Sequence, residues 1–235
     1  MKSIGIHIFR KDLRVVDNLA LNELASRVDT IIPIFILDPS QIERTPTNRN
    51  HFSPRAARFI LDSLLELQAA CDNKLCVLRG SVIKSLRAVC AKRKPVCISF
   101  NADYSAYALK RDREIMDWCR SQGIETVINY DDQTLRPMDK LTKSDGSPYL
   151  VYGSFYKHAR TRQVTLPKTA KISFINPVAS LAVSVSYIRS TYRDDTNHFI
   201  GGRSYGLSKL HTKRSIDGFK HRDILINKSF ELSPY

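Results

Sequence analysis

The sequence predicts an α/β protein with a doubly wound, five-stranded parallel sheet, and three observations support this prediction. Short apolar runs rich in β-branched residues recur through the first half of the chain. Capped helical patterns alternate with these runs, as expected when helices join parallel strands and cover both faces of a sheet. Hydrophobic residues make up 43% of the 235 residues, which is enough to form a substantial core.

The predicted strands are the five short apolar runs, at 3–9, 30–37, 75–80, 96–100 and 124–130. Runs such as "SIGIHIF" and "TIIPIFIL" are typical of strands buried on both faces. Ligands of doubly wound sheets bind beyond the carboxyl ends of the strands. The candidate site segments are therefore 9–18, 37–54, 80–82, 101–107 and 130–135.

The helices predicted between the strands have recognisable ends. Asp17 or Asn18 is placed to cap a helix that starts in "NLALNELAS". The clearest helix is "SPRAARFILDSLLELQAAC", where Ser53 caps, Pro54 opens, and apolar residues from 60 to 71 share one face. Two more helices are predicted in "SVIKSLRAVC" and in "SAYALKRDREIMDWCRSQG", the second ended by a glycine.

The pattern changes in the second half of the chain. "YGSFYKHART" predicts a short basic helix with aromatic residues, and "GGRSYGLSKLHTKR" predicts another basic helix. Residues 164–200 keep neither rhythm for long, which indicates an inter-domain connector. The predicted divisions are an α/β domain at 1–163, a linker at 164–200, and a C-terminal segment at 201–235.

The formal net charge of +14 favours a polyanionic partner, and nucleic acid is the default expectation, the alternative being a soluble protein that happens to be basic. Five cysteines, an odd number, lie in apolar segments and indicate reduced thiols in the cytosol or nucleus. Their spacing gives little support to a zinc site. No apolar run approaches the roughly 20 residues of a membrane span, and no signal peptide begins the chain. We therefore expect a protein that is not secreted.

Several nucleotide and catalytic signatures are absent, including G-x-G-x-x-G, the Walker sequence, G-x-S-x-G and H-E-x-x-H. The first turn instead carries "FRKDLRVVDNLAL", which by composition alone favours a salt-bridged loop. The order of its residues resembles the opening signature of the DNA photolyase/cryptochrome family. The resemblance continues in order through "FILDP", "FSPRAARFILDSLLELQ", "VLRGS", "FNADYSAYALKRDREI", "GSPYLVYGSFYKHA", "GGRSYGLSKL" and "HRDILINKSFELSPY".

This resemblance implies the N-terminal portion of a class I-like photolyase, a light-driven lyase that repairs pyrimidine dimers caused by ultraviolet light. In the family, a segment like "LSPY" leads into the large helical domain that holds FAD and the lesion, so the resemblance implies that residues 201–235 are the truncated start of this FAD-binding domain. We therefore expect this chain to be inactive unless a second chain supplies that domain, and to bind no FAD alone. Trp118 is the single tryptophan, so a family-type tryptophan electron-transfer chain is not expected.

The resemblance also implies an antenna site at the strand ends for a folate or a deazaflavin. The expected residues are an apolar wall and an acid, Phe35, Leu37 and Asp38, and a polar and stacking set, Asn101, Asp103 and Tyr104. An equally weighted alternative for Asp103 is an acid that complements a helix dipole. Ser105-Ala106 stands where many relatives carry Glu-Pro, which weakens the case for either pigment.

Ser229 and Ser233 are expected to be remnants of the family's FAD phosphate contact, because "SFELS" keeps only these two hydroxyls. No catalytic residue and no metal ligand is predicted. Two alternatives stay open beside the photolyase interpretation: a non-catalytic, cryptochrome-like module that binds a chromophore or nucleotide, and a decayed remnant that folds without a function. The sequence leaves the pigment, and cyclobutane against 6–4 lesions, undecided.

Overall fold

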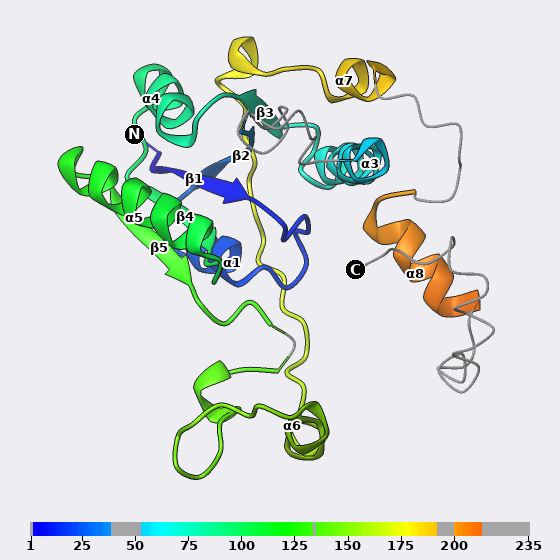
Figure 1. Cartoon of the computed structure of the whole chain (residues 1–235). Coiled ribbons are helices and arrows are strands. Elements are labelled where there is room, and N and C mark those ends of the chain that lie inside the picture. The colour runs from blue at the N-terminus through cyan, green and yellow to red at the C-terminus, as the bar shows by residue number, and fades with distance from the viewer. Residues whose placement is uncertain (1, 39–52, 134, 192–199, 213–235) are drawn as a thin grey trace, which may run out of the picture. The chain divides into compact units, whose positions relative to one another are not determined.

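The computed structural model describes residues 2–38, 53–133, 135–191 and 200–212 of the chain (Figure 1). Contacts divide the chain into two compact units. The sheet unit comprises residues 1–43 and 68–183, and the helical unit comprises residues 44–67 and 184–235. Each unit is described by itself.

The sheet unit is built on five parallel strands in the order β3-β2-β1-β4-β5. The strands are β1 (Ile4–Phe9), β2 (Thr30–Leu37), β3 (Cys76–Arg79), β4 (Cys97–Asn101) and β5 (Glu125–Asn129). In register, Ile6 of β1 lies opposite Ile32 of β2 and Ile98 of β4. The predicted fold class and all five predicted strands are therefore confirmed, with ends that differ by a residue.

Helices cover both faces of this sheet (Figure 1). On one face, α4 (Val82–Lys92) and α5 (Ala106–Ser121) add Leu86, Val89 and Ile115 to the main core around Ile6 and Ile98. On the other face lies α1 (Leu19–Ala25), whose Leu24 side chain comes so close to Gly5 that a Cβ there would lie 2.8 Å from it. Opposite faces of one strand thus meet different helices, which defines the doubly wound arrangement.

The segment predicted as a connector begins inside the sheet unit. Phe174 forms a parallel bridge with Ile31 of β2, and Val178 is fully buried in the main core. The N–H of Val183 donates to the carbonyl of Val77 at 2.8 Å. A short 3₁₀ turn, η2 (Ala179–Leu181), lies between these anchor points. The compact units divide after Val183, whereas the predicted divisions at 163 and 200 remain predictions.

After β5 the chain forms a separate lobe of the sheet unit and then continues into the connector segment just described. The α6 lobe, residues 137–167, contains the 3₁₀ turn η1 (Met138–Lys140) and the helix α6 (Tyr152–Ala159), where the sequence predicts a short basic helix. Asp17 holds both of its ends: its carboxylate accepts from Arg136 Nη2 at 3.0 Å and from the N–H of Lys168 at 3.2 Å.

The helical unit contains most of α3 (Pro54–Ala70), with α7 (Val185–Thr191) and α8 (Arg203–Thr212). The Glu66 carboxylate accepts from the N–H of Ser204 at 3.0 Å, so α3 caps the start of α8. A Cβ on Gly201 would lie 1.9 Å from the carbonyl oxygen of Phe59. Helices α3 and α8 confirm two predicted helices; α7 was not predicted, and an ion pair between Arg189 and Asp62 contributes to its position. No helix in the described residues is long and apolar enough to cross a membrane.

Candidate functional site

The turn after β1 is held by a buried hydrogen-bond network around Asp12. The Asp12 carboxylate accepts from the N–H of Arg10 at 2.8 Å, from Asn18 Nδ2 at 3.1 Å and from Asn101 Nδ2. Asn18 also caps α1, accepting from the N–H of Leu21 at 3.2 Å, which confirms one of the two predicted caps. Since buried polar groups are costly unless paired, these side chains fix the turn rather than wait for a ligand.

A buried ion pair continues this network beneath the strand ends. Arg10 contacts the Asp112 carboxylate with two nitrogens, at 3.0 and 2.8 Å. Its guanidinium carbon lies 4.0 Å from the centre of the Phe100 ring. Burial lowers the pKa of Arg10 to about 10, a value at which the side chain is still charged at neutral pH. The charges that the sequence gathers at the first turn are therefore largely structural.

A second, exposed layer of side chains lies above this network at the carboxyl ends of β2, β1 and β4. Lys11 Nζ lies 3.1 Å from the Asp103 carboxylate, and the Tyr107 hydroxyl donates to the Asp38 carboxylate at 3.0 Å. Tyr104 donates its hydroxyl to the Tyr130 carbonyl while its side chain stays 53% exposed. We call this layer, Lys11, Asp38, Asp103, Tyr104 and Tyr107, the strand-end site.

Asp103, one of the two acids of this site, is charged at neutral pH. Partial burial alone would raise the pKa of Asp103, but the hydrogen bond and the positive charge of Lys11 outweigh it and leave the pKa below its ordinary value. The backbone N–H of Tyr104 also donates to this carboxylate, at 2.7 Å. Both interpretations of Asp103 therefore keep support, since it is tied to the turn before α5 and also faces a neighbouring cation.

The structure brings together three of the predicted antenna residues, Asp38, Asp103 and Tyr104. Asn101 is only 5% exposed, and its side-chain amide is engaged with Asp12, Asn18 and the N–H of Ala20. Phe35 and Leu37 are 6% and 7% exposed within β2, so they offer little surface to a ligand. Ser229 and Ser233 lie outside the described residues.

Two residues of the strand-end site were missed by sequence reasoning, Lys11 and Tyr107. A signal for both was available. Lys11 is the second residue after the first strand, and Tyr107 lies in the first turn of the helix that follows Tyr104. Both therefore belong to the segments where ligands of parallel sheets bind.

The donor set of the strand-end site suits a flat conjugated molecule that carries N–H groups. The rings of Tyr104 and Tyr107 are 53% and 43% exposed and offer faces for stacking. The carboxylates of Asp38 and Asp103 can accept hydrogen bonds, and Lys11 can donate one. This chemistry fits the pterin ring of a folate or the ring system of a deazaflavin.

A cleft of about 690 Å³ lies elsewhere in the sheet unit, beside the α6 lobe. Its charged lining is already paired, Arg14 with Asp132 at 2.6 Å and Asp17 with Arg136 at 3.0 Å. Burial raises the pKa of Asp132 despite the charge of Arg14. The charges of both sites are thus engaged within the protein, but the residues described as lining the cleft include no tyrosine, whereas the strand-end site offers two exposed tyrosine rings.

Neither the cysteines nor the acids of the described residues suggest metal or thiol chemistry. No group of three or more His, Cys, Asp or Glu side chains is arranged there to hold a metal ion. All five cysteines are described, and none forms a disulfide. Burial raises the pKa of Cys71 and Cys119 to about 12, so both are unreactive thiols at neutral pH.

The fold and the strand-end site are those of an α/β domain that can hold a flat ligand at the carboxyl edge of its sheet, and comparison with known proteins identifies the family. A model of the DNA photolyase family matches residues 5–172, which is more than half of the chain, so the chain belongs to this family. Over 86% of the chain, it is 29% identical to the (6-4)DNA photolyase of Arabidopsis thaliana. It is 26% identical, over 67% of its length, to the deoxyribodipyrimidine photo-lyase of a Synechococcus strain.

Solved structures give the same result. The archaeal photolyase from Sulfolobus tokodaii shares 30% identity and a TM-score of 0.76, covering 94% of this chain and 48% of that one. A Synechocystis cryptochrome matches in fold with a TM-score of 0.74 at 20% identity. The chain spans 39% of the Arabidopsis relative and 32% of the Synechococcus relative. The five-stranded sheet and its helices match the N-terminal domain of photolyases.

Proposed function

We propose that this chain forms the chromophore-binding α/β part of a light-driven photolyase that repairs ultraviolet-induced pyrimidine dimers in DNA. The observation that carries the proposal is the strand-end site, which gathers exposed tyrosine rings and carboxylates at the carboxyl edge of the sheet in a chain of the DNA photolyase family. Both photolyase relatives are named for DNA repair enzymes.

In this proposal a bound pigment absorbs light and passes its excitation energy on, and the protein holds the pigment in place. The exposed face of Tyr104 stacks on the pigment, while the bond from Tyr104 to Tyr130 fixes the orientation of the ring. Asp38, oriented by Tyr107, accepts a hydrogen bond from a ring N–H. The ion pair of Lys11 and Asp103 offers a donor and an acceptor at the opposite side of the strand-end site.

Three pigments deserve a direct test. Folate and deazaflavin follow from the chemistry of the donor set. A flavin is the third, because the structure of the Sulfolobus tokodaii photolyase contains two FAD molecules and implicates a novel light-harvesting cofactor.

DNA is the proposed substrate, and the net charge of +14 supports it. We expect this part of the protein to bind DNA through phosphates, in a salt-dependent way and without preference for damaged duplex. The reduced, buried cysteines support a location in the cytosol or nucleus.

The pigment proposal is tested by titrating each pigment into the purified chain and following absorbance and fluorescence. We expect Tyr104→Ala to weaken binding by about 5- to 150-fold, since a stacked ring contributes about 1–3 kcal/mol. Tyr104→Phe keeps the ring but loses the hydrogen bond to the Tyr130 carbonyl, and should therefore lose less affinity than Tyr104→Ala. Tyr187→Ala, at a tyrosine on α7 that is 72% exposed and does not belong to the strand-end site, is the matched control. Equal binding by Tyr104→Ala and Tyr187→Ala would contradict the site.

The second candidate function is a cryptochrome-like module without repair activity, and the similarity to mammalian Cryptochrome-1, 29% over 155 residues, favours it as the alternative. Light-dependent survival after ultraviolet exposure separates the two when a photolyase-deficient bacterium expresses this chain together with the FAD-binding helical domain of a photolyase relative, because the chain alone is expected to be inactive. The same helical domain expressed without this chain is the control. Survival that rises only under illumination supports repair. Pigment binding without any light-dependent survival would favour the cryptochrome-like function.

A further inference from the structure

One face of α6 carries an exposed stripe of two tyrosines and an arginine. Tyr152, Tyr156 and Arg160 follow one another at four-residue spacing, so they lie on the same side of the helix and its C-cap. Tyr152 is 75% exposed and Tyr156 is 52% exposed. Their rings are stacked, with centroids 6.0 Å apart and planes inclined by 22°.

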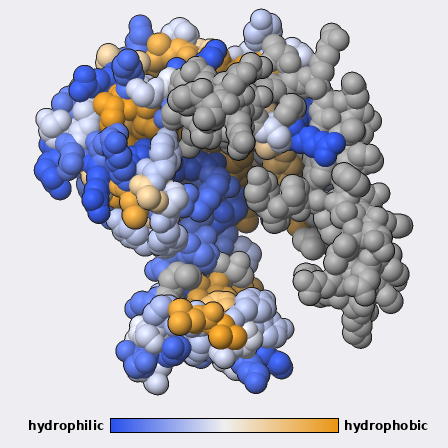
Figure 2. Space-filling view, in the orientation of Figure 1, coloured by the Kyte–Doolittle hydropathy of each residue, from blue (hydrophilic) through white to orange (hydrophobic). Residues whose placement is uncertain are grey.

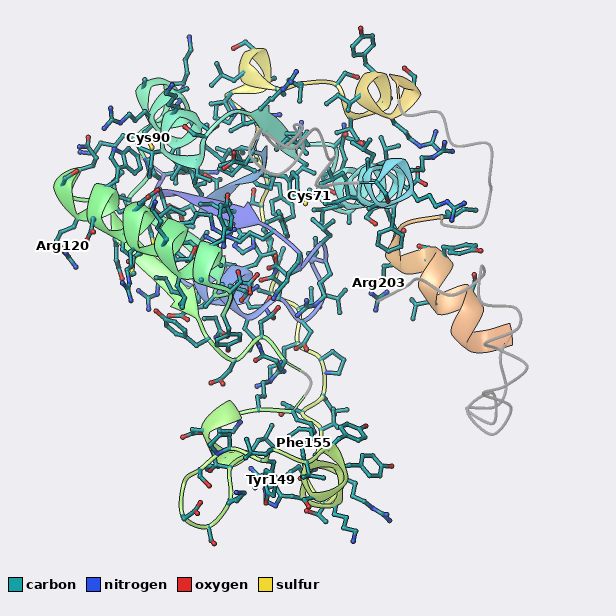
Figure 3. The ribbon with its side chains drawn as sticks, viewed as in Figure 1. Cys71, Cys90, Arg120, Tyr149, Phe155 and Arg203 are labelled. Atoms are coloured by element: carbon teal, nitrogen blue, oxygen red, sulfur yellow. The ribbon has the colours of Figure 1, made fainter. Side chains whose placement is uncertain are left out.

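The lobe does not need this stripe for its own packing. Tyr149 and Phe155 meet edge to face with centroids 6.2 Å apart (Figure 3), and Ala159 is 5% exposed. Tyr149 also stacks on His158 at 5.7 Å. Tyr152 touches this interior only at its margin, with a tilted contact to Phe155 at 6.4 Å. Large aromatic surface left outside an interior of this kind indicates a partner.

The charge around the stripe identifies the chemistry of that partner. Lys157 on α6 and Arg160 at its C-cap are exposed, and Arg162 lies two residues further along the chain. Elsewhere in the α6 lobe the basic residues are Lys140 and Lys143, and the acidic residues are Asp139 and Asp145. Asp145 is engaged with the hydroxyl and N–H of Ser147. Figure 2 shows a hydrophobic patch on this lobe bordered by hydrophilic surface.

We propose that the α6 stripe is a stacking surface for single-stranded nucleic acid. Unpaired bases present their flat faces to aromatic rings, and the neighbouring cations neutralise the phosphates. A base placed on the outer face of Tyr152 extends the stack that Tyr152 and Tyr156 already form. Arg160 and Lys157 lie where the phosphates of that strand would pass. Duplex DNA keeps its bases stacked internally and cannot make this contact.

This inference goes beyond the proposed function, because it concerns a surface outside the strand-end site and needs no pigment. It also goes beyond binding by charge alone, since it requires the rings. An apolar protein partner is the competing occupant, because Leu150 and Val151 beside the stripe are 88% and 65% exposed. Single-stranded nucleic acid needs aromatic rings at positions 152 and 156, whereas an apolar protein partner needs only apolar side chains there.

The test is the fluorescence anisotropy of labelled 20-nucleotide strands titrated with the full chain at two salt concentrations. The probes are oligo-dT, oligo-rU, a duplex of equal length, and an abasic strand that keeps every phosphate. We expect both single strands to bind more tightly than the duplex and the abasic strand. The double variant Tyr152→Ala/Tyr156→Ala should lose at least about tenfold in affinity for oligo-dT and almost nothing for the abasic strand.

Three further variants make the result decisive. Tyr152→Phe/Tyr156→Phe should restore binding, whereas Tyr152→Leu/Tyr156→Leu, which keeps apolar area without an aromatic face, should not. Arg160→Gln should reduce the salt dependence by about 0.7 log units per log unit of salt, the value for one contact to a single strand. Tyr187→Ala, on α7, should bind like the unmodified chain.

The proposal is overturned if the abasic strand binds as well as oligo-dT, or if the leucine variant retains full affinity. It is also overturned if the tyrosine variants change only the self-association of the chain, measured by sedimentation, because the face would then be a protein interface. Circular dichroism and thermal melting of each variant establish that a loss of binding is not a loss of folding.

Discussion

The turn after β1 and the α6 lobe are both rich in arginine and aromatic residues, but they use them in opposite ways. In the turn, Arg10 is enclosed between Asp112 and Phe100, and Asp12 accepts three hydrogen bonds. In the lobe, Tyr152 and Arg160 face solvent. Buried charges that are fully paired fix a backbone, whereas exposed rings and cations are available to a partner. Residue type alone does not distinguish a structural group from a binding group; its partners do.

The largest expected effect tests how much the buried ion pair of Arg10 and Asp112 contributes to the free energy of unfolding. Asp112→Ala leaves the buried charge of Arg10 without its partner and should lower the free energy of unfolding by about 3–5 kcal/mol. Asp117→Ala, on the same helix, breaks an Arg120 pair whose carboxylate is 72% exposed and should cost at most about 1 kcal/mol. Urea denaturation of both variants measures the difference. Similar losses in the two would contradict the comparison.

The next effect concerns the amide that links α1 to the network. Asn18→Ala removes the N-cap and one donor to the buried Asp12 carboxylate, and we expect a loss of about 2–3 kcal/mol. Ser105→Ala removes only a cap, the bond to the N–H of Ala108 at 3.2 Å, and should cost about 1 kcal/mol. Thermal or urea unfolding of both variants isolates the contribution of the network. Equal costs would show that Asp12 is satisfied by its other donors.

The next prediction concerns the pH dependence of the free energy of unfolding, which we expect to depend on His7, a buried residue of β1. Burial lowers the pKa of His7 to about 4 from an ordinary value of 6.5; it outweighs the charge of Asp12, which raises the pKa, and the charge of Arg10 adds a smaller lowering effect. The folded state therefore holds the neutral ring, and its stability is complete above pH 6.5 and declines as the pH falls toward 4. Between pH 7 and pH 5 we expect a loss of about 2 kcal/mol from this group.

The control for this prediction is His7→Gln, which has no titrating ring and should flatten the stability curve between pH 7 and pH 5. The ring hydrogen-bonds to Ser99 at 2.7 Å through Nδ1, so the variant also reports on that contact through its stability at pH 7. A pH dependence that is identical in both proteins would show that His7 is not its source.

The smallest expected effect lies in the lobe. Tyr152→Ala should change the free energy of unfolding by less than about 0.5 kcal/mol, because the side chain is 75% exposed and packs only at its margin. Urea denaturation of this variant is compared with that of the unmodified chain. A loss above about 1 kcal/mol would mean that Tyr152 supports the lobe, contrary to its assignment as a binding surface.

The sequence allowed the sheet and most of its helices to be predicted because apolar runs and caps are local signals. The site was predicted less completely. Asn101 is the last residue of β4 and Tyr104 follows three residues later, yet Asn101 is buried in a network and Tyr104 is 53% exposed. Which of two polar side chains points inward depends on partners from distant segments, here Asp12 and Asn18, and no local pattern contains that information.

The connector shows the same limit. Phe174 lies opposite Ile31, and the two hydrogen bonds of this bridge are made by its neighbours: the Ile31 N–H donates to the Ser173 carbonyl and the Ile175 N–H donates to the Ile31 carbonyl, both at 2.9 Å. Backbone bonds leave little trace in residue choice, so a segment with two prolines and scattered serines gave no strand signal. The helix α7 was missed for a related reason, since its contact to Asp62 is long-range and its seven residues are too few for a clear period.

The clamp at Asp17 has a consequence for engineering. One residue receives both the outgoing chain, through Arg136, and the returning chain, through Lys168, so the α6 lobe is a loop whose two stems meet at a fixed point of the scaffold. Insertions attached in this manner can usually be exchanged without remodelling their host. We therefore expect that the lobe can be replaced by a short glycine-serine linker without loss of the sheet. We also expect that the lobe of a relative can be joined to the same two stems.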